Sequence, residues 1–142
     1  MTTQFLEPTQ LSAMALFERR IHGPVVMLNL LRFRDRADYS QHPALAPMAA
    51  ISGAAAFDLY IAQTLPHLQA SGGELLFMGA GGPFFIGPAQ EYWHRVMLVR
   101  QSSVDAFIAF ARNEAYLQDA IGHRTAALED SRLLPLEDMA LV

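Results

Sequence analysis

The chain has 142 residues, of which 52% are hydrophobic, and its formal net charge at pH 7 is −4. This length suits one domain with a buried core, and the composition excludes a disordered chain, so we predict a single domain over residues 1–142. All ten basic residues are Arg and there is no Cys, which excludes lysine Schiff-base chemistry, thiol nucleophiles, disulfides and thiolate-bound metals. The acidic charge argues against a nucleic-acid partner.

The N-terminal residues and the length of the apolar runs indicate the cellular compartment of the protein. Residues 1–8 carry Glu7 and no positive charge, so they do not resemble a signal peptide. No apolar run approaches the roughly 18 residues that a membrane span needs, and the lack of disulfides fits a reducing compartment. We therefore expect a cytoplasmic protein without a membrane partner. The Ala-rich, Arg-only composition favours a bacterial source.

The N-terminal half predicts a helix, a strand, a long loop and a second helix. Thr9 can cap a helix over residues 10–20, within an N-terminal helical segment 1–22. Residues 25–33 predict a central strand, because both of its faces are mostly apolar. Residues 34–51 show no clear period, and we expect an ordered loop that covers a pocket. A helix follows over residues 52–71.

The C-terminal half predicts strands and helices in alternation. The strands are expected at residues 74–78 with a continuation at 84–87, at 92–100 and within 132–142, and the helical pieces from Ser102 onward and over 113–122. Alternation in the third strand places Trp93 on one side together with Met97 and Val99.

These elements give a fold class. After the N-terminal helix the order is β-α-β-β-α-β, which predicts a ferredoxin-like α+β domain whose antiparallel sheet has its helices on one face. The other face would carry Trp93 or Asn29 among large apolar residues. Because an apolar face of that size does not stay in water, we predict a homodimer in which two such faces meet.

Few residues show a recognised catalytic or binding pattern. The five histidines lack the spacing of a helical zinc site, the glycine-rich turn at residues 79–83 lacks the Lys and helix of a phosphate loop, and no nucleophile elbow occurs. We therefore expect no metal and no cofactor. Asn29 is a mid-strand amide that needs partners, and His123-Arg124 follows a predicted helix end, where free carbonyls favour cations or where the pair would bind an anion.

The sequence resembles a known family at several ordered positions between about residues 23 and 135. The matching positions are the strand VVMLNLLRF, Tyr60, Gly72-Gly73, Trp93 and His123-Arg124. They resemble the bacterial domain-of-unknown-function 1330-like family of the dimeric α/β-barrel superfamily. The resemblance implies a ferredoxin-like fold and a barrel made by two sheets. The family usually has Asp after this Trp, whereas His94 stands here.

Three functions stay open. The first is binding or processing of a small, partly apolar carboxylate in a pocket between sheet and helices, with Asn29, Tyr60, Trp93, His123 and Arg124 as candidate ligand-binding residues. The second, implied by haem-degrading members of the superfamily, is a cofactor-free or haem-using monooxygenase that works with Asn29, Trp93 and His123. The third is a non-catalytic interaction module. No catalytic pair is evident, so the sequence does not decide whether the chain is an enzyme.

Overall fold

The computed structural model describes residues 4–139, which hold four strands and six helical segments. Along the chain these are α1 (Gln10–Glu18), β1 (Val25–Phe33), η1 (Pro43–Leu45), α2 (Gly53–Ala70), β2 (Glu74–Ala80), β3 (Arg95–Gln101), α3 (Val104–Ala111), α4 (Glu114–Asp119), α5 (Ile121–Ala127) and β4 (Leu128–Glu137). No helix in this part of the chain combines the length and the apolar character that crossing a membrane requires.

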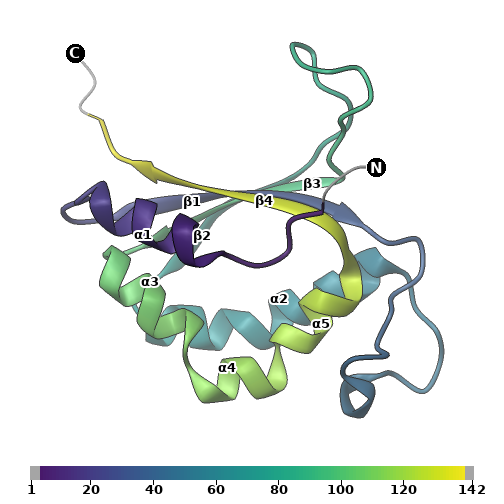
Figure 1. The fold of residues 1–142 in the computed structure, drawn as a ribbon. Helices are drawn as coiled ribbons and strands as arrows, with labels where there is room; N and C mark the ends of the chain where they lie inside the picture. Colours follow the sequence, from purple (N-terminus) through teal and green to yellow (C-terminus); the bar gives the residue numbers. More distant parts are fainter. Residues whose placement is uncertain (1–3, 140–142) are drawn as a thin grey trace.

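The four strands form one antiparallel sheet in the order β2-β3-β1-β4. Helices α2 to α5 all lie on one side of it (Figure 1), and α1 packs where β1 begins, with Leu16 against Val25 and Met27. The predicted α+β class and the one-sided placement of the helices are confirmed.

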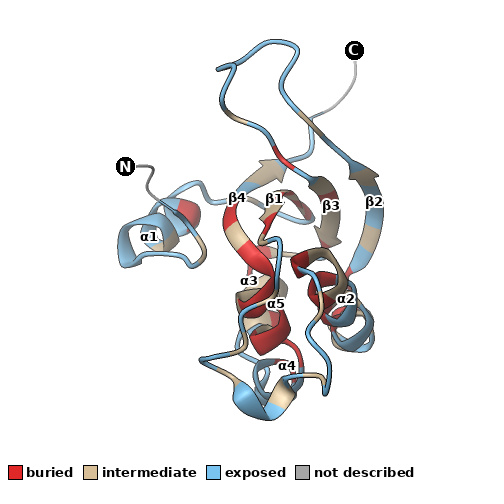
Figure 2. Ribbon diagram, turned by 90° about the vertical axis from the view of Figure 1, so that its right-hand side faces the viewer, coloured by how far each residue is buried: buried red, intermediate tan, exposed pale blue. Residues whose placement is uncertain are grey.

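The alternation of β1 divides the sheet into two faces. Val25, Met27, Leu31 and Phe33 are buried against the helices, and the intervening residues are half-buried. Figure 2 shows the buried residues gathered between the sheet and α2 and α5. We call the opposite side, which no described helix covers, the open face. By register its apolar members are Val26, Leu28, Leu30, Phe77, Val96, Leu98, Leu134 and Leu136.

Of the two residues expected on the open face, Trp93 lies there and Asn29 does not; the expectation that Trp93 shares a side with Met97 is wrong. Asn29 pairs with Met97, a core residue, and lies on the helix side rather than on the open face. The Trp93 ring packs against the guanidinium groups of Arg32 and Arg132. These two arginines point to the open face, because their neighbours in β1 and β4 point to the helices. Trp93 therefore lies on the open face and does not share a side with Met97. Trp93 lies before β3, where the alternation on which the prediction rested does not apply.

The connection between β2 and β3 also differs from the prediction. Residues 84–87 do not continue β2, and β3 begins at Arg95 instead of residue 92. The two sides of the connection are joined at its base by the Pro83–Tyr92 bridge and by hydrogen bonds from the Gly81 and Trp93 N–H groups to the His94 and Gly82 carbonyls. Pro83 and Pro88 have no N–H to donate, which disfavours a longer ladder. Residues 81–93 instead form a projection, which we call the arm, that rises from the sheet on the side of the open face (Figure 1).

Three element boundaries fall elsewhere than expected. Ser103, not Ser102, caps α3 by accepting from the Ala106 N–H. The helical piece expected over residues 113–122 is two helices that meet at Ala120, so His123 and Arg124 lie within α5 and not beyond a helix end. β4 begins at Leu128, four residues early, because residues 128–131 pair with the end of β1; residues 140–142 of the predicted strand lie outside the described residues.

The loop over residues 34–51 is fastened to α5. The backbone N–H groups of Arg34 and Asp38 donate to the carbonyls of Ala127 and Ala126, and the Tyr39 hydroxyl lies 2.8 Å from His123 Nδ1. These contacts support an ordered loop. That the loop covers a pocket stays a prediction, since only its first two residues reach the cleft described next.

Candidate functional site

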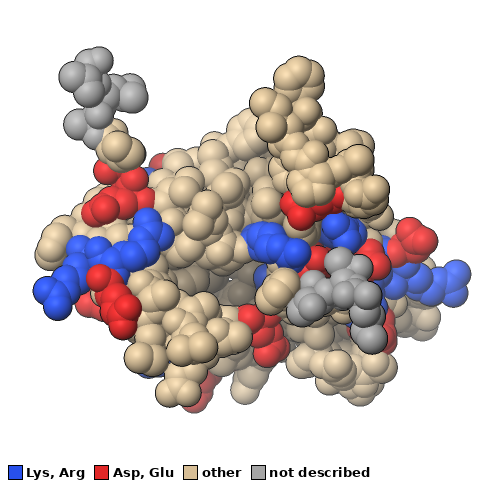
Figure 3. All heavy atoms as spheres, turned by 45° about the horizontal axis from the view of Figure 1, so that its top comes forward, with Lys and Arg blue, Asp and Glu red and all other residues tan. Residues whose placement is uncertain are grey.

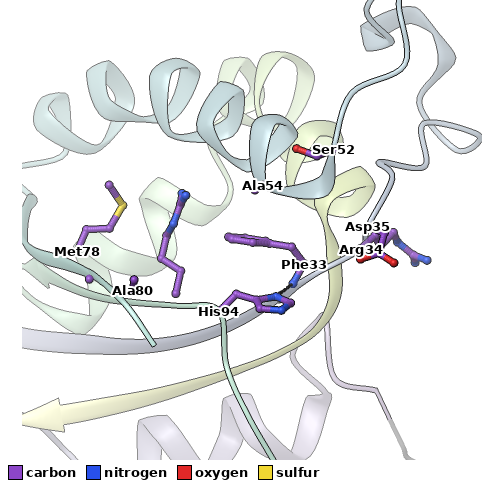
Figure 4. Close-up of a pocket in the computed structure, with 10 residues that line it drawn as sticks. Phe33, Arg34, Asp35, Ser52, Ala54, Met78, Ala80 and His94 are labelled. Carbon is purple, nitrogen blue, oxygen red and sulfur yellow. Dashed lines mark hydrogen bonds between the residues drawn. The ribbon is translucent and has the colours of Figure 1, made fainter. Parts of the chain in front are cut away.

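A cleft of about 590 Å³ opens between the beginning of α2 and one end of the sheet. The ends of β1 and β2 meet the start of β3 there, so residues distant in sequence face one space (Figure 4). Its lining comprises Phe33, Arg34, Asp35, Ser52, Ala54, Met78, Gly79, Ala80, His94 and Arg95. The volume is in the range of small-molecule sites.

His94 has a fixed orientation in this cleft. Its Nδ1 accepts the backbone N–H of Phe33 at 2.9 Å, and its ring stacks on the Phe33 ring with centroids 5.8 Å apart. With Nδ1 acting as the acceptor, the proton of the neutral imidazole is on Nε2. No residue between 4 and 139 accepts from Nε2, so the side chain can donate to a bound molecule.

Arg95 brings a cation to the same wall. Its Nη1 donates to Asp58 Oδ1 at 2.8 Å, and its guanidinium lies 4.9 Å from the centre of the Phe33 ring. A single bond to Asp58 leaves most of the five guanidinium donors unused. The ion pair orients the group and, since Asp58 is largely exposed, contributes little to stability.

The beginning of α2 forms the opposite wall. Ser52 caps it by accepting from the Ala55 N–H, and the Gly53 N–H donates to the Arg34 carbonyl. A side chain at Gly53 would meet that carbonyl oxygen at 2.2 Å, so only glycine permits this close approach. The Arg34 side chain points away from Phe33 in Figure 4, and its buried Nε has no hydrogen-bond partner within the described chain.

None of the five residues proposed from the sequence lines this cleft. Asn29 is buried and donates through Nδ2 to its near neighbour, the Met27 carbonyl, at 3.1 Å. The Tyr60 hydroxyl lies 2.8 Å from the Tyr116 hydroxyl in the core, and burial, with Tyr60 beside it, raises the pKa of Tyr116. The amide and the two hydroxyls therefore have partners inside the protein.

His123 and Arg124 hold chain segments together. His123 is buried against Tyr39, and burial lowers the pKa of His123 and raises that of Tyr39. Arg124 donates to the Leu6 carbonyl at 2.7 Å and to Ser131 Oγ at 3.4 Å, which ties the N-terminal segment to β4. Like Asn29, both residues lie on the helix side of the sheet; that they share a ligand stays a prediction.

Trp93 stands apart from the other four candidates. It is 2% exposed, packed between Arg32 and Arg132 on the open face, and its Nε1 donates to Glu91 at 3.3 Å. The sheet separates it from Asn29 and His123. The three residues expected by analogy with haem-degrading enzymes therefore do not converge within one chain.

Local sequence patterns contain only a partial signal for the cleft. Of residues 93–95, only Trp93 was a predicted ligand-binding residue, and His94 stood out only as a departure from the resembling family. His94 and Arg95 do share the cleft, because the His94 side chain occupies the position of a ladder acceptor for Phe33. Within residues 4–139 no three His, Asp or Glu side chains are placed to hold a metal ion.

Solved structures include relatives of this chain, whereas family models and curated sequences do not. The chain matches no family model and no curated protein sequence. Two crystal structures of the protein RPA0582, one of them of the methylated protein, superpose on it with a TM-score of 0.82 at 33% sequence identity. They match 98% of this chain, and the match spans 98% and 100% of their own.

This chain belongs to the family of RPA0582. RPA0582 is described as a protein of unknown function from Rhodopseudomonas palustris. Membership in the RPA0582 family therefore accounts for the fold of nearly the whole chain and transfers no activity, because function depends on the site.

Proposed function

We propose that this protein binds a small, partly apolar molecule with a carboxylate group in the cleft between α2 and the sheet. The observation that carries the proposal is the meeting of His94 and Arg95 at the aromatic wall formed by Phe33. The imidazole Nε2–H and the guanidinium are donors, and a carboxylate accepts from both. Phe33 and Met78 provide the apolar surface for the rest of the molecule.

The charges that line the cleft favour an anion. Arg95 brings a guanidinium group to the Phe33 wall, and among the lining residues Arg34 and Asp35 are neighbours of opposite charge. A helix N-terminus adds partial positive charge, and α2 directs its first turn at the cleft through Ala54. A cationic ligand at the Phe33 wall would meet repulsion from the Arg95 guanidinium.

We further propose that two copies pair through their open faces, as a ferredoxin-like barrel of the domain-of-unknown-function 1330-like type. The strand order β2-β3-β1-β4 supports this type of fold. The apolar open face supports the pairing, because apolar residues gathered on one uncovered face are typical of interaction surfaces. Figure 3 shows that side of the molecule, where uncharged surface separates groups of Arg and acidic residues.

The other two functions have less support. A monooxygenase that uses Asn29, Trp93 and His123 requires one shared pocket, and Trp93 is on the far side of the sheet. An interaction module without a ligand is favoured by the open face alone. It leaves the unused donors of His94 and Arg95 without a role.

The experiment is an NMR titration of the protein with phenylacetate, compared with uncharged 2-phenylethanol. We expect phenylacetate to shift the amide signals of Ala54, Gly79 and Ala80, and 2-phenylethanol to do so much less. In an Arg95→Gln variant the affinity for phenylacetate should fall about tenfold or more, because a hydrogen bond to a charged group contributes roughly 1.5–3 kcal/mol.

The matched control is Arg112→Gln, which removes an exposed Arg at the end of α3, away from the cleft. This variant should bind phenylacetate as the unaltered protein does. Equal loss in both variants would mean that phenylacetate responds to net charge only. Absence of any localised shift with phenylacetate would leave the interaction module as the better explanation.

A further inference from the structure

The arm carries apolar side chains that no other part of residues 4–139 covers. Phe85 is 101% exposed and Ile86 87% exposed at its tip. The base of the arm is firmly held, since Trp93 packs between two guanidinium groups and Arg32 donates twice to the Tyr92 carbonyl, at 3.2 and 3.1 Å. A rigid stem with an apolar tip is typical of an element that inserts into a partner.

A groove suited to such a tip lies at the other end of the sheet. It has a volume of about 160 Å³ and is bordered by the end of α1, the turn after it and the start of α3. Its lining consists of Leu16, Phe17, Arg20, Ile21, Ser103, Val104 and Asp105. An apolar cavity of about 150 Å³ accommodates benzene; the groove is similar in volume, and Leu16, Phe17, Ile21 and Val104 form its apolar part.

The arm cannot reach this groove in its own chain. The arm leaves the sheet next to the end of β1, where Arg95 pairs with Leu31, whereas the groove lies where β1 begins. The nine residues of β1 separate the two by about 30 Å. In a face-to-face pair the two-fold axis can lie between the two sheets and run perpendicular to their strands. Such an axis places the arm end of one sheet next to the groove end of the other.

We propose that the arm of one copy docks in the groove between α1 and α3 of a second copy, with the Phe85 ring as the inserted group. The two-fold axis makes the contact reciprocal, so two arms and two grooves are used. This inference rests on the dimer proposed above.

The area that a stable dimer needs favours a second copy as the occupant. Stable pairs bury about 800 Å² on each partner. The apolar residues of β1 on the open face are half-buried, so the arm tip adds apolar surface that those residues do not provide. Two fully exposed large apolar side chains at the arm tip add on the order of 300–400 Å² per copy.

The absence of cysteine provides a clean test by cross-linking. One preparation carries Ile86→Cys, beside Phe85 on the arm. A second preparation carries Phe17→Cys in the groove and a longer tag, so that the two chains differ in size. After mixing and mild oxidation we expect a disulfide-linked dimer that contains one chain of each size. The control replaces Phe17→Cys with Leu59→Cys, which is similarly exposed on α2 and should give at least fivefold less mixed product.

Light scattering of the unaltered protein separates the two proposals. If the unaltered protein is a dimer but Phe17→Cys gives no more two-size disulfide-linked dimer than Leu59→Cys, the docking of the arm is wrong and the open-face dimer is still supported. A monomer at micromolar concentration overturns both. A Phe85→Ser variant, which changes a fully exposed residue, should fold normally and dissociate at least tenfold more readily; unchanged dissociation would contradict the insertion of Phe85.

Discussion

Replacement of His94 separates its structural role from its binding role. In His94→Ala the Phe33 N–H loses its acceptor and the Phe33 ring loses a stacked neighbour. An unpartnered buried donor costs about 1–3 kcal/mol. Because His94 is itself exposed, water can approach the freed N–H, so we expect a loss near the lower limit, about 1 kcal/mol. For a chain of this size that lowers the melting temperature by about 4 °C.

Two isosteric variants sharpen this prediction. His94→Asn keeps an oxygen close to the position of Nδ1 and removes the Nε2–H donor, so it should unfold like the unaltered protein in urea and bind phenylacetate more weakly. His94→Gln keeps a terminal donor and removes the acceptor, so it should lose stability as His94→Ala does. Hydrogen exchange of the Phe33 amide is the direct measurement. Unchanged protection of that amide in His94→Ala would refute the assignment of the bond.

Two further changes give defined outcomes. Gly53→Ala should destabilise the protein by about 3 kcal/mol or more in urea unfolding, because its Cβ would lie 2.2 Å from the Arg34 carbonyl oxygen; Gly82→Ala, with nothing within 4 Å of its Cβ, should change stability by no more than about 0.5 kcal/mol. Since burial lowers the pKa of His123, the unfolded chain takes up a proton below about pH 6.5 that the folded protein does not. The free energy of unfolding should therefore decline as the pH falls from 6.5 toward the lowered value, and His123→Gln should decline less between pH 7.5 and 5.5.

The regular elements were readable from the sequence because local patterns determine them. The nearly continuous apolar run of residues 25–33 predicted both the span of β1 and its central position, and the cap at Thr9 predicted where α1 begins. The α2 helix is preceded by its cap, Ser52, and is followed by Gly72, whose φ of +83° suits the end of a helix. These signals lie within a few residues of the structure that they specify.

The cleft could not be predicted because the His94 side chain, and not a backbone carbonyl, accepts the Phe33 N–H at the end of the β1–β3 ladder. Alternation predicts which way side chains point only within a regular strand, and the strand is no longer regular at His94. This arrangement turns His94 and Arg95 toward α2 and leaves Trp93 on the open face. The partners of Arg124 were similarly hidden, since Leu6 and Ser131 are 118 and 7 residues away along the chain.

The two faces of the sheet meet in consecutive residues of one segment. Trp93 anchors the arm between Arg32 and Arg132 on the open face, and the next residue, His94, forms the wall of the cleft. One peptide bond joins them, so we expect docking of the arm to change how the imidazole sits against Phe33. The site and the proposed interface therefore share a mechanical connection, although the sheet keeps a bound molecule and a second copy apart. Phenylacetate affinity measured above and below the dissociation concentration of the dimer would report this connection as a difference between the two values.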